Sequence, residues 1–247
     1  MSREFKNVYD DKERARAYAE LEFPGTYYLA FRDLPRVFRQ YVTGIRALDF
    51  GCGAGRSTRF LRSLGFRVVG VDISRPMLDR ARKFDPSGDY HLVADGDLGS
   101  FEEGCFDLVL SAFTFDNIPT LRQKQSALIS LKRLLADQGR IVSVVSSPDI
   151  YINEWASFST RDYPANKKAV SGDKVLIRML DVADRRPVED VMCSEHDYRE
   201  LYRQVSLSVL ETLQPLATGT EPMKWVSETE IAPWTIHVLD AGVDLAT

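Results

Sequence analysis

Between residues 45 and 146, short apolar runs rich in β-branched residues alternate with helical stretches. Apolar strands separated by helices of this length form a parallel sheet that is covered on both faces, so this alternation restricts the fold strongly. The sequence therefore predicts a doubly wound, Rossmann-like α/β fold with right-handed crossovers. The runs that predict its strands are IRALDF (45–50), RVVGVD (67–72), YHLVAD (90–95), FDLVLS (106–111) and RIVSVV (140–145).

The remaining segments predict additions to the same single domain of residues 1–247. Residues 1–44 predict N-terminal helices that form a lid, and residues 149–193 predict a cap insertion rich in aromatic side chains. Within that insertion, KVLIRML (174–180) and PVEDVMC (187–193) predict a hairpin. Residues 194–247 predict a closing helix, which begins at Ser194, and two closing strands, SVLETLQPLA (208–217) and WTIHVLD (234–240).

Composition argues against several classes of protein. The net charge of the 247 residues is −4, whereas proteins that bind the phosphate backbone usually carry a basic excess. The three cysteines form no C-x-x-C pair, which predicts neither a disulfide framework nor a zinc site, and no metal site is expected. No secretory h-region and no apolar run of about 20 residues is present, so we expect a cytoplasmic protein without membrane segments.

The segment ALDFGCGAGRST (47–58) predicts a strand, a tight glycine turn and a helix. Glycines allow backbone angles that other residues avoid and let a ligand approach the main chain. The spacing of Gly51, Gly53 and Gly55 is G-x-G-x-G, and Arg56 stands where the dinucleotide fingerprint places its third glycine. Asp49 precedes the turn, and an acid there suits a ligand with an ammonium and a sulfonium better than one with phosphates.

Further polar positions follow neighbouring strands. Asp72 ends the second strand, where a carboxylate can accept both hydrogen bonds of a ribose diol, although it could equally be a helix N-terminal charge. Asp95-Gly96-Asp97 follows the third strand, where a carboxylate could accept from an adenine amino group or simply form a polar turn. The segment FDLVLSAFTFDNIP (106–119) carries the fourth strand into an aromatic loop. All these positions lie at the carboxyl edge of the predicted sheet, where open α/β folds bind ligands.

These motifs, in this order, resemble those of the class I S-adenosylmethionine-dependent methyltransferases and are similar to their small-molecule branch. ALDFGCGAG matches the first motif of the family, VVGVDIS its acidic second-strand motif, VADGD its adenine-side motif and FDLVLSAFTFDNIP its fourth-strand motif. LLADQGRIVSVV departs mildly, because LxPGG is more usual before the fifth strand. The resemblance covers about residues 45–146 and implies a seven-stranded sheet whose last strand is antiparallel.

The resemblance also implies roles for individual residues. Asp49, Gly51 and Gly53 would hold the methionine end of S-adenosylmethionine, Asp72 its ribose, and Ile73, Asp95 and Gly96 its adenine. Ser111 and Phe113 would flank the sulfonium, and Tyr18 and Tyr27 are lid contacts if they do not simply pack the helices. The full set of predicted cofactor contacts is Asp49, Gly51, Cys52, Gly53, Gly55, Asp72, Ile73, Met77, Asp95, Gly96, Asp97, Ser111, Phe113, Tyr18 and Tyr27.

The acceptor side is less defined. Methyl transfer needs placement of the nucleophile and exclusion of water, and a general base only when the acceptor must lose a proton. His196 and Asp116 are weak candidates for such a base, whereas His91 and His237 are interpreted as structural. The predicted acceptor contacts are Phe115, Asn117, Tyr151, Trp155 and Phe158, although aromatic residues in a cap also form its core.

The prediction is therefore methyl transfer from S-adenosylmethionine to a small-molecule acceptor, which releases S-adenosylhomocysteine. The alternatives are a methyltransferase that acts on RNA or protein, and a non-catalytic protein that binds S-adenosylmethionine. The basic residues between Arg56 and Lys83 fall on the outer faces of two helices and favour a solvated surface over a nucleic-acid site. The sequence favours no particular acceptor, methylated atom or oligomeric state.

Overall fold

The computed structural model describes residues 10–93 and 97–242. Seven strands form one sheet in the order β3-β2-β1-β4-β5-β10-β9. Strands β3, β2, β1, β4 and β5 pair in parallel, and β10 is antiparallel to both of its neighbours. The α/β fold and the antiparallel closing strand predicted from the sequence are confirmed.

Most helices and strands begin and end near the residues predicted from the sequence. The N-terminal half contains α1 (Lys12–Ala19), α2 (Thr26–Arg32), α3 (Leu34–Tyr41), β1 (Arg46–Phe50), α4 (Arg56–Ser63), β2 (Arg67–Asp72), α5 (Arg75–Phe84), β3 (Asp89–Leu92), β4 (Phe106–Ala112) and α6 (Thr114–Asn117). The C-terminal half contains α7 (Leu121–Leu134), β5 (Leu135–Ser146), β6 (Phe158–Ser159), β7 (Lys174–Met179), β8 (Val188–Val191), α8 (Glu195–Gln204), β9 (Ser208–Leu213) and β10 (Trp234–Asp240), with 3₁₀ turns η3 (Pro148–Tyr151) and η4 (Pro164–Lys168).

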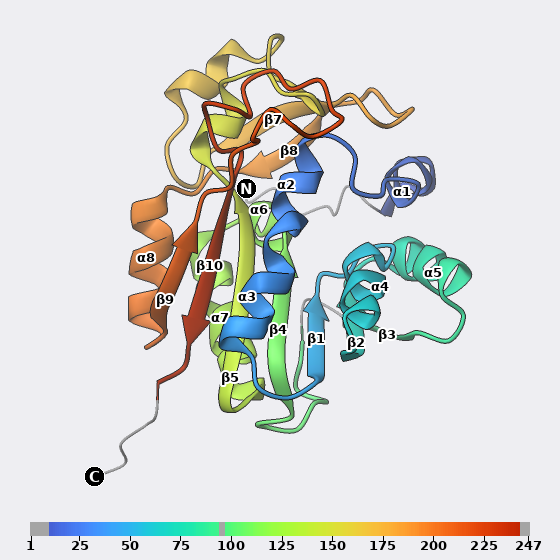
Figure 1. Cartoon of the computed structure of the whole chain (residues 1–247), viewed down its shortest axis with the longest axis vertical. Helices are drawn as coiled ribbons and strands as arrows, with labels where there is room; N and C mark the ends of the chain where they lie inside the picture. The colour runs from blue at the N-terminus through green and yellow to red at the C-terminus, as the bar shows by residue number, and fades with distance from the viewer. Residues whose placement is uncertain (1–9, 94–96, 243–247) are drawn as a thin grey trace, which may run out of the picture.

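The core lies on both faces of the sheet because successive side chains of each strand point to opposite sides. Ala47 of β1 packs in the cluster that contains α2 and α3, whereas the next residue, Leu48, packs in the cluster that contains α7 and α8. Figure 1 shows α3 in front of the sheet and α7 behind it. Two covered faces account for strands that are apolar along their whole length.

The cap lies over the carboxyl end of the parallel strands (Figure 1). Its hairpin β7–β8 is antiparallel, as predicted, and β6 pairs with β7. The cap also includes residues 214–233, between β9 and β10, which the sequence did not predict to belong to it. Glu228 from this segment is fully buried and accepts hydrogen bonds from Thr26 Oγ1 (2.6 Å) and Ala156 N (2.7 Å).

Two predicted boundaries were wrong. The fifth strand, predicted over residues 140–145, begins earlier, because β5 starts at Leu135 and pairs with Phe106 before its register shifts. Gln138 takes a left-handed conformation (φ 62°) within this bulge, which replaces a separate loop. The closing strand predicted over residues 208–217 ends at Leu213, because the chain then turns into the second part of the cap.

Candidate functional site

The glycine turn joins β1 to α4 and has the conformation that its glycines predict. Gly51, Gly53 and Gly55 all have positive φ angles, between 54° and 79°. A Cβ on Gly51 would overlap the side chain of Thr114, which itself donates to Phe50 O (2.8 Å). The turn is closed against β2 by the N–H groups of Gly51 and Cys52, which both donate to Val71 O (2.9 Å each). A side chain at position 51 would therefore be both strained and obstructed.

Asp49 lies beneath this turn and is fully buried. Ser57 Oγ (2.7 Å) and Thr58 Oγ1 (2.6 Å) from the first turn of α4 donate to its Oδ2. Its Oδ1 has no hydrogen-bond partner among residues 10–93 and 97–242. Burial raises the pKa of Asp49 to about 6, against the opposing effect of the two hydroxyls. This buried carboxylate oxygen therefore keeps the capacity to accept a hydrogen bond.

Asp72 connects the second strand to the same turn. Its Oδ2 accepts from Gly53 N (2.8 Å) and its Oδ1 accepts from Ser74 N (2.7 Å), so the carboxylate faces the glycine turn rather than only the start of α5. Burial raises its pKa above the ordinary value for Asp. Each carboxylate oxygen can accept a further hydrogen bond, which leaves capacity for a diol.

The adenine-side and sulfonium-side predictions have different outcomes. Asp95 and Gly96 lie outside the described residues, while Asp97 is exposed and accepts from Gly99 N (2.8 Å), as an ordinary polar turn would. Ile73 is 41% exposed and is free to cover a ligand. Ser111 is buried at the end of β4, and its Oγ has no partner in the described part of the chain. Phe113 has a φ of 64°, a strained angle for a bulky residue.

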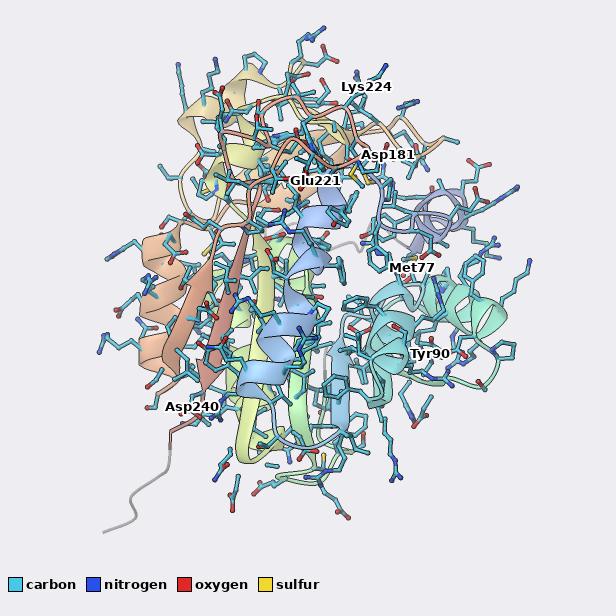
Figure 2. The ribbon with its side chains drawn as sticks, viewed as in Figure 1. Met77, Tyr90, Asp181, Glu221, Lys224 and Asp240 are labelled. Carbon is cyan, nitrogen blue, oxygen red and sulfur yellow. The ribbon has the colours of Figure 1, made fainter. Side chains whose placement is uncertain are left out.

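A cavity of about 40 Å³ lies between the glycine turn, the end of β4 and the N-terminal helices. Met77 covers Gly53 and packs with Ala15 and Ala19 of α1, and Figure 2 shows Met77 at the end of α5 that faces α1. Tyr27 is buried instead among Phe113, Phe158 and Trp234. The cavity is lined by Tyr18, Ala19, Leu21, Phe31, Gly51, Cys52, Gly53, Ala54, Arg56, Ser57, Ala112 and Phe113.

The residues predicted to contact an acceptor lie mostly in the core. Tyr151, Trp155 and Phe158 are each less than 5% exposed, and Phe115 packs on the opposite face of the sheet with Phe50. Asn117 donates to Phe113 O (3.2 Å) and so supports the strained backbone at the end of β4. Their burial favours the interpretation that the cap aromatics form the cap's own core.

The two candidate bases lie apart from the glycine turn. His196 is exposed on α8, which packs on β9 at the far edge of the sheet from β1, so the structure does not bring it to the predicted site. Asp116 is buried and accepts from Ser146 N (3.1 Å) and Ser146 Oγ (2.8 Å). His237 is fully buried in β10, where its Nε2 lies 3.3 Å from Glu195.

Asp116 belongs to a buried polar cluster beneath the cap that the sequence did not predict. Asp190 of β8 accepts from Tyr151 Oη (3.3 Å), and burial together with the nearby charge of Asp116 raises the pKa of Asp190 to about 8. Lys124 of α7 is fully buried, donates to Phe115 O and lowers the pKa of both acids. Burial raises the pKa values of Asp116 and Asp190 despite this lysine. The cluster links α6, α7 and the cap.

Two further observations concern metals and membranes. The described residues contain no group of three His, Cys, Asp or Glu side chains that could hold a metal ion. Among the same residues, no helix combines the length and the apolar character that crossing a membrane requires.

Residues 48–143 match the family model described as a methyltransferase domain. A ubiquinone biosynthesis O-methyltransferase from Burkholderia ambifaria is 29% identical over 57% of this chain and 55% of its own length. An 18S rRNA (guanine-N(7))-methyltransferase from Bos taurus is 36% identical over 40% of this chain and 34% of its own length. The chain spans about half the length of curated relatives that it matches.

A crystal structure of a Pyrococcus horikoshii protein shares the fold, with a TM-score of 0.64, 17% identity, and coverage of 92% of this chain and 98% of that one. The matched segment contains the strand tips, the glycine turn and both acids described above. The domain match, the relatives and the shared fold together support the class I S-adenosylmethionine-dependent methyltransferase family for this chain.

Proposed function

We propose that this protein binds S-adenosylmethionine at the glycine turn and transfers its methyl group to a small-molecule acceptor. The observation that carries the proposal is Asp49, a buried carboxylate with one open oxygen directly beneath the turn. The cofactor supplies a methyl group bound to a sulfonium, which leaves as neutral S-adenosylhomocysteine. Asp49 would hold its ammonium, Gly51 and Gly53 would let the methionine chain approach the backbone, and Asp72 would accept from the ribose.

The end of β4 supports the transfer itself. The backbone N–H of Phe113 donates to Val144 O (2.8 Å), which fixes the strained residue where β4 meets the cavity. Its ring packs against Tyr27, Phe31 and Trp234, so apolar side chains surround this point and exclude water. Since methyl transfer depends on placement and on exclusion of water, these residues supply what the reaction needs from the protein.

The N-terminal segment would act as a lid. The cavity of about 40 Å³ is close to the volume of a single water molecule, so a ligand the size of a nucleoside can enter only if side chains of α1 or their helix move. Helix α1 is short and packs on α5 through the small residues Ala15 and Ala19. A helix with so little buried apolar surface can separate from α5 at low cost.

A small acceptor is favoured by the charges that surround the site. Three arginines on the outer faces of α4 and α5 are paired with carboxylates: Arg59 with Glu22 (3.0 Å), Arg62 with Asp85, and Arg82 with Asp79 (3.7 Å). Paired arginines offer little net charge to a phosphate backbone. Because one relative is an 18S rRNA methyltransferase, an RNA acceptor is the alternative to be tested.

The test has two stages. Calorimetry with S-adenosylmethionine and S-adenosylhomocysteine on the wild type and on Asp72→Ala should show binding that the variant loses. Transfer of a labelled methyl group is then measured with a metabolite fraction below 1 kDa and, separately, with total RNA. Label in the metabolite fraction supports the proposal, and label only in RNA overturns its acceptor class. A folded wild type that binds neither molecule overturns the proposal itself.

A further inference from the structure

Arg56 is the first residue of α4, and its side chain is held among aromatic rings. Its guanidinium carbon lies 4.8 Å from the ring centroid of Tyr27, 5.5 Å from that of Phe23 and 5.7 Å from that of Phe31. The ring of Tyr18 lies 5.8 Å away, and one nitrogen donates to Glu22 O (2.5 Å). The guanidinium therefore has a fixed position over four rings contributed by the N-terminal helices and the segment between them.

This arginine differs from the others on its helix. Arg59 and Arg62 each pair with a carboxylate, whereas Arg56 has no carboxylate partner among residues 10–93 and 97–242. Arg56 is half-buried and lines the cavity together with Gly51, Gly53 and Phe113. A cation that faces a cavity without a counter-ion is a site for a ligand anion.

Arg56 and Asp49 carry opposite charges close to the same cavity. The positive charge of Arg56 lowers the pKa of Asp49, so the two groups interact electrostatically. Ser57 both lines the cavity and donates to Asp49, which places the carboxylate directly behind the cavity wall. The cavity thus has a negative group behind the glycine turn and a positive group at its N-terminal helix side.

We infer that Arg56 binds the carboxylate of the cofactor's methionine end while Asp49 binds its ammonium. This inference rests on the proposed function. It gives a role to Arg56, which the sequence alone marks only as a departure from the dinucleotide-binding fingerprint. A guanidinium can donate two parallel hydrogen bonds to a carboxylate, and the four rings hold its plane in place and keep out water. The pair selects a zwitterionic amino-acid end over a ligand that lacks either charge.

Calorimetry with three ligands tests the inference: S-adenosylmethionine, decarboxylated S-adenosylmethionine, and methylthioadenosine, which lacks the amino-acid end. Wild type should bind S-adenosylmethionine more tightly than its decarboxylated form. Arg56→Met should weaken S-adenosylmethionine by about 10- to 100-fold and leave the other two ligands unchanged. Arg62→Met, on the same helix but paired with Asp85 and outside the cavity lining, is the matched control and should change none of the three.

The outcomes separate the possible failures. If Arg56→Met weakens all three ligands equally, the arginine only holds the N-terminal helices through its rings, and the inference is wrong. If the variant weakens none of them, Arg56 does not contact the cofactor and the inference is again wrong. If wild type binds none of the three, the proposed cofactor fails first, which is distinguishable because Arg56→Met then has nothing to change.

Discussion

Carboxylates are buried both at the glycine turn and in the core beneath the cap, but the donors and charges around them differ. At the turn, Asp49 receives two hydroxyl donors on one oxygen and none on the other within the described chain. Beneath the cap, Asp116 receives donors from Ser146, and Lys124 supplies a compensating positive charge. The protein completes the second site by itself and leaves the first incomplete. Because a buried charge is costly without partners, the incomplete site is the one that a ligand should complete.

The largest effect is expected where the compensating cation is removed. Lys124→Met would leave Asp116 and Asp190 buried without it, and should lower the free energy of unfolding by about 3 kcal/mol at pH 8. Urea denaturation measures this change. Lys83→Met is the matched control, because Lys83 is exposed on α5 and should tolerate the same substitution.

The pH dependence of that loss distinguishes charge from packing. The charge of Lys124 lowers the pKa of both acids, so its removal raises these pKa values further, and the folded variant binds more protons at Asp116 and Asp190 than folded wild type does. The deficit of Lys124→Met should therefore shrink between pH 8 and pH 5. A deficit that stays constant over this range would mean that the lysine stem, rather than its charge, stabilises the cap.

The second expected effect concerns Asp49, where removal of a charge should increase the stability of the unliganded protein. Asp49→Asn keeps an oxygen for Ser57 and Thr58 but removes the charge, so it should weaken S-adenosylmethionine by about 10- to 100-fold. Since burial raises the pKa of Asp49 from 3.8 to about 6, ionisation of Asp49 destabilises the unliganded protein progressively as the pH rises from about 4 to 6, and the cost is constant above that. The stability of the variant relative to wild type should thus increase by about 2 kcal/mol between pH 4 and pH 8.

Urea denaturation of the unliganded proteins at pH 4, 6 and 8 gives this difference, and calorimetry gives the binding. The comparison between the two sites predicts opposite results: loss of charge at Asp49 costs binding and gains stability, whereas loss of charge at Lys124 costs stability. If Asp49→Asn binds the cofactor as wild type does, the open oxygen is not a ligand site and the comparison fails.

These two sites also show how much the sequence could predict. Asp49 stands next to a glycine turn between a strand and a helix, and the periodicity of the flanking residues fixes both elements, so the position was predictable. Asp116 stands in a similar loop after a strand, and the sequence suggested a substrate-side role for it as well. Its surroundings come from Ser146 and Asp190, at sequence separations that no local pattern reports.

The cap was predicted incompletely for the same reason. Segment 214–233 has no strand or helix period, and it belongs to the cap because Glu228 bonds to Thr26, a residue 202 positions away in the sequence. The aromatic residues Tyr151, Trp155 and Phe158 are compatible with either a binding surface or a core, and only the packing of the folded chain decides between them. Turns and strands follow from local chemistry, whereas burial of a loop depends on distant partners.

A third, smaller effect concerns the affinity of the wild type as a function of pH. Binding of an ammonium needs Asp49 ionised, and its pKa is raised to about 6 in the unliganded protein. Affinity for S-adenosylmethionine should therefore be constant above pH 7 and should fall by up to tenfold per pH unit below about pH 6. Calorimetry between pH 5 and 8 tests this, with Asp49→Asn as the control that should lose the dependence.

The smallest effect is expected at the surface contact between the lid and the cap. Arg186 of the β7–β8 loop donates to Asp11 Oδ2 (3.0 Å) just before α1, and to Asp184 (2.9 Å) of its own loop. Asp184 also lies 3.4 Å from Arg14 of α1. The loop containing the labelled Asp181 lies above α1 in Figure 2, in agreement with these contacts. The ion pairs of Asp11 with Arg186 and of Arg14 with Asp184 therefore link α1 to the cap.

Arg186→Ala should leave global unfolding almost unchanged, because exposed ion pairs contribute little to stability. It should nevertheless increase the rate of amide hydrogen exchange in α1, since local opening costs less than global unfolding and depends on these few contacts. High salt should produce the same increase in wild type and little further increase in the variant. Exchange that rises equally in α1 and in β4 would instead indicate loss of global stability, and the lid would then not be separable from the sheet that carries the cofactor site.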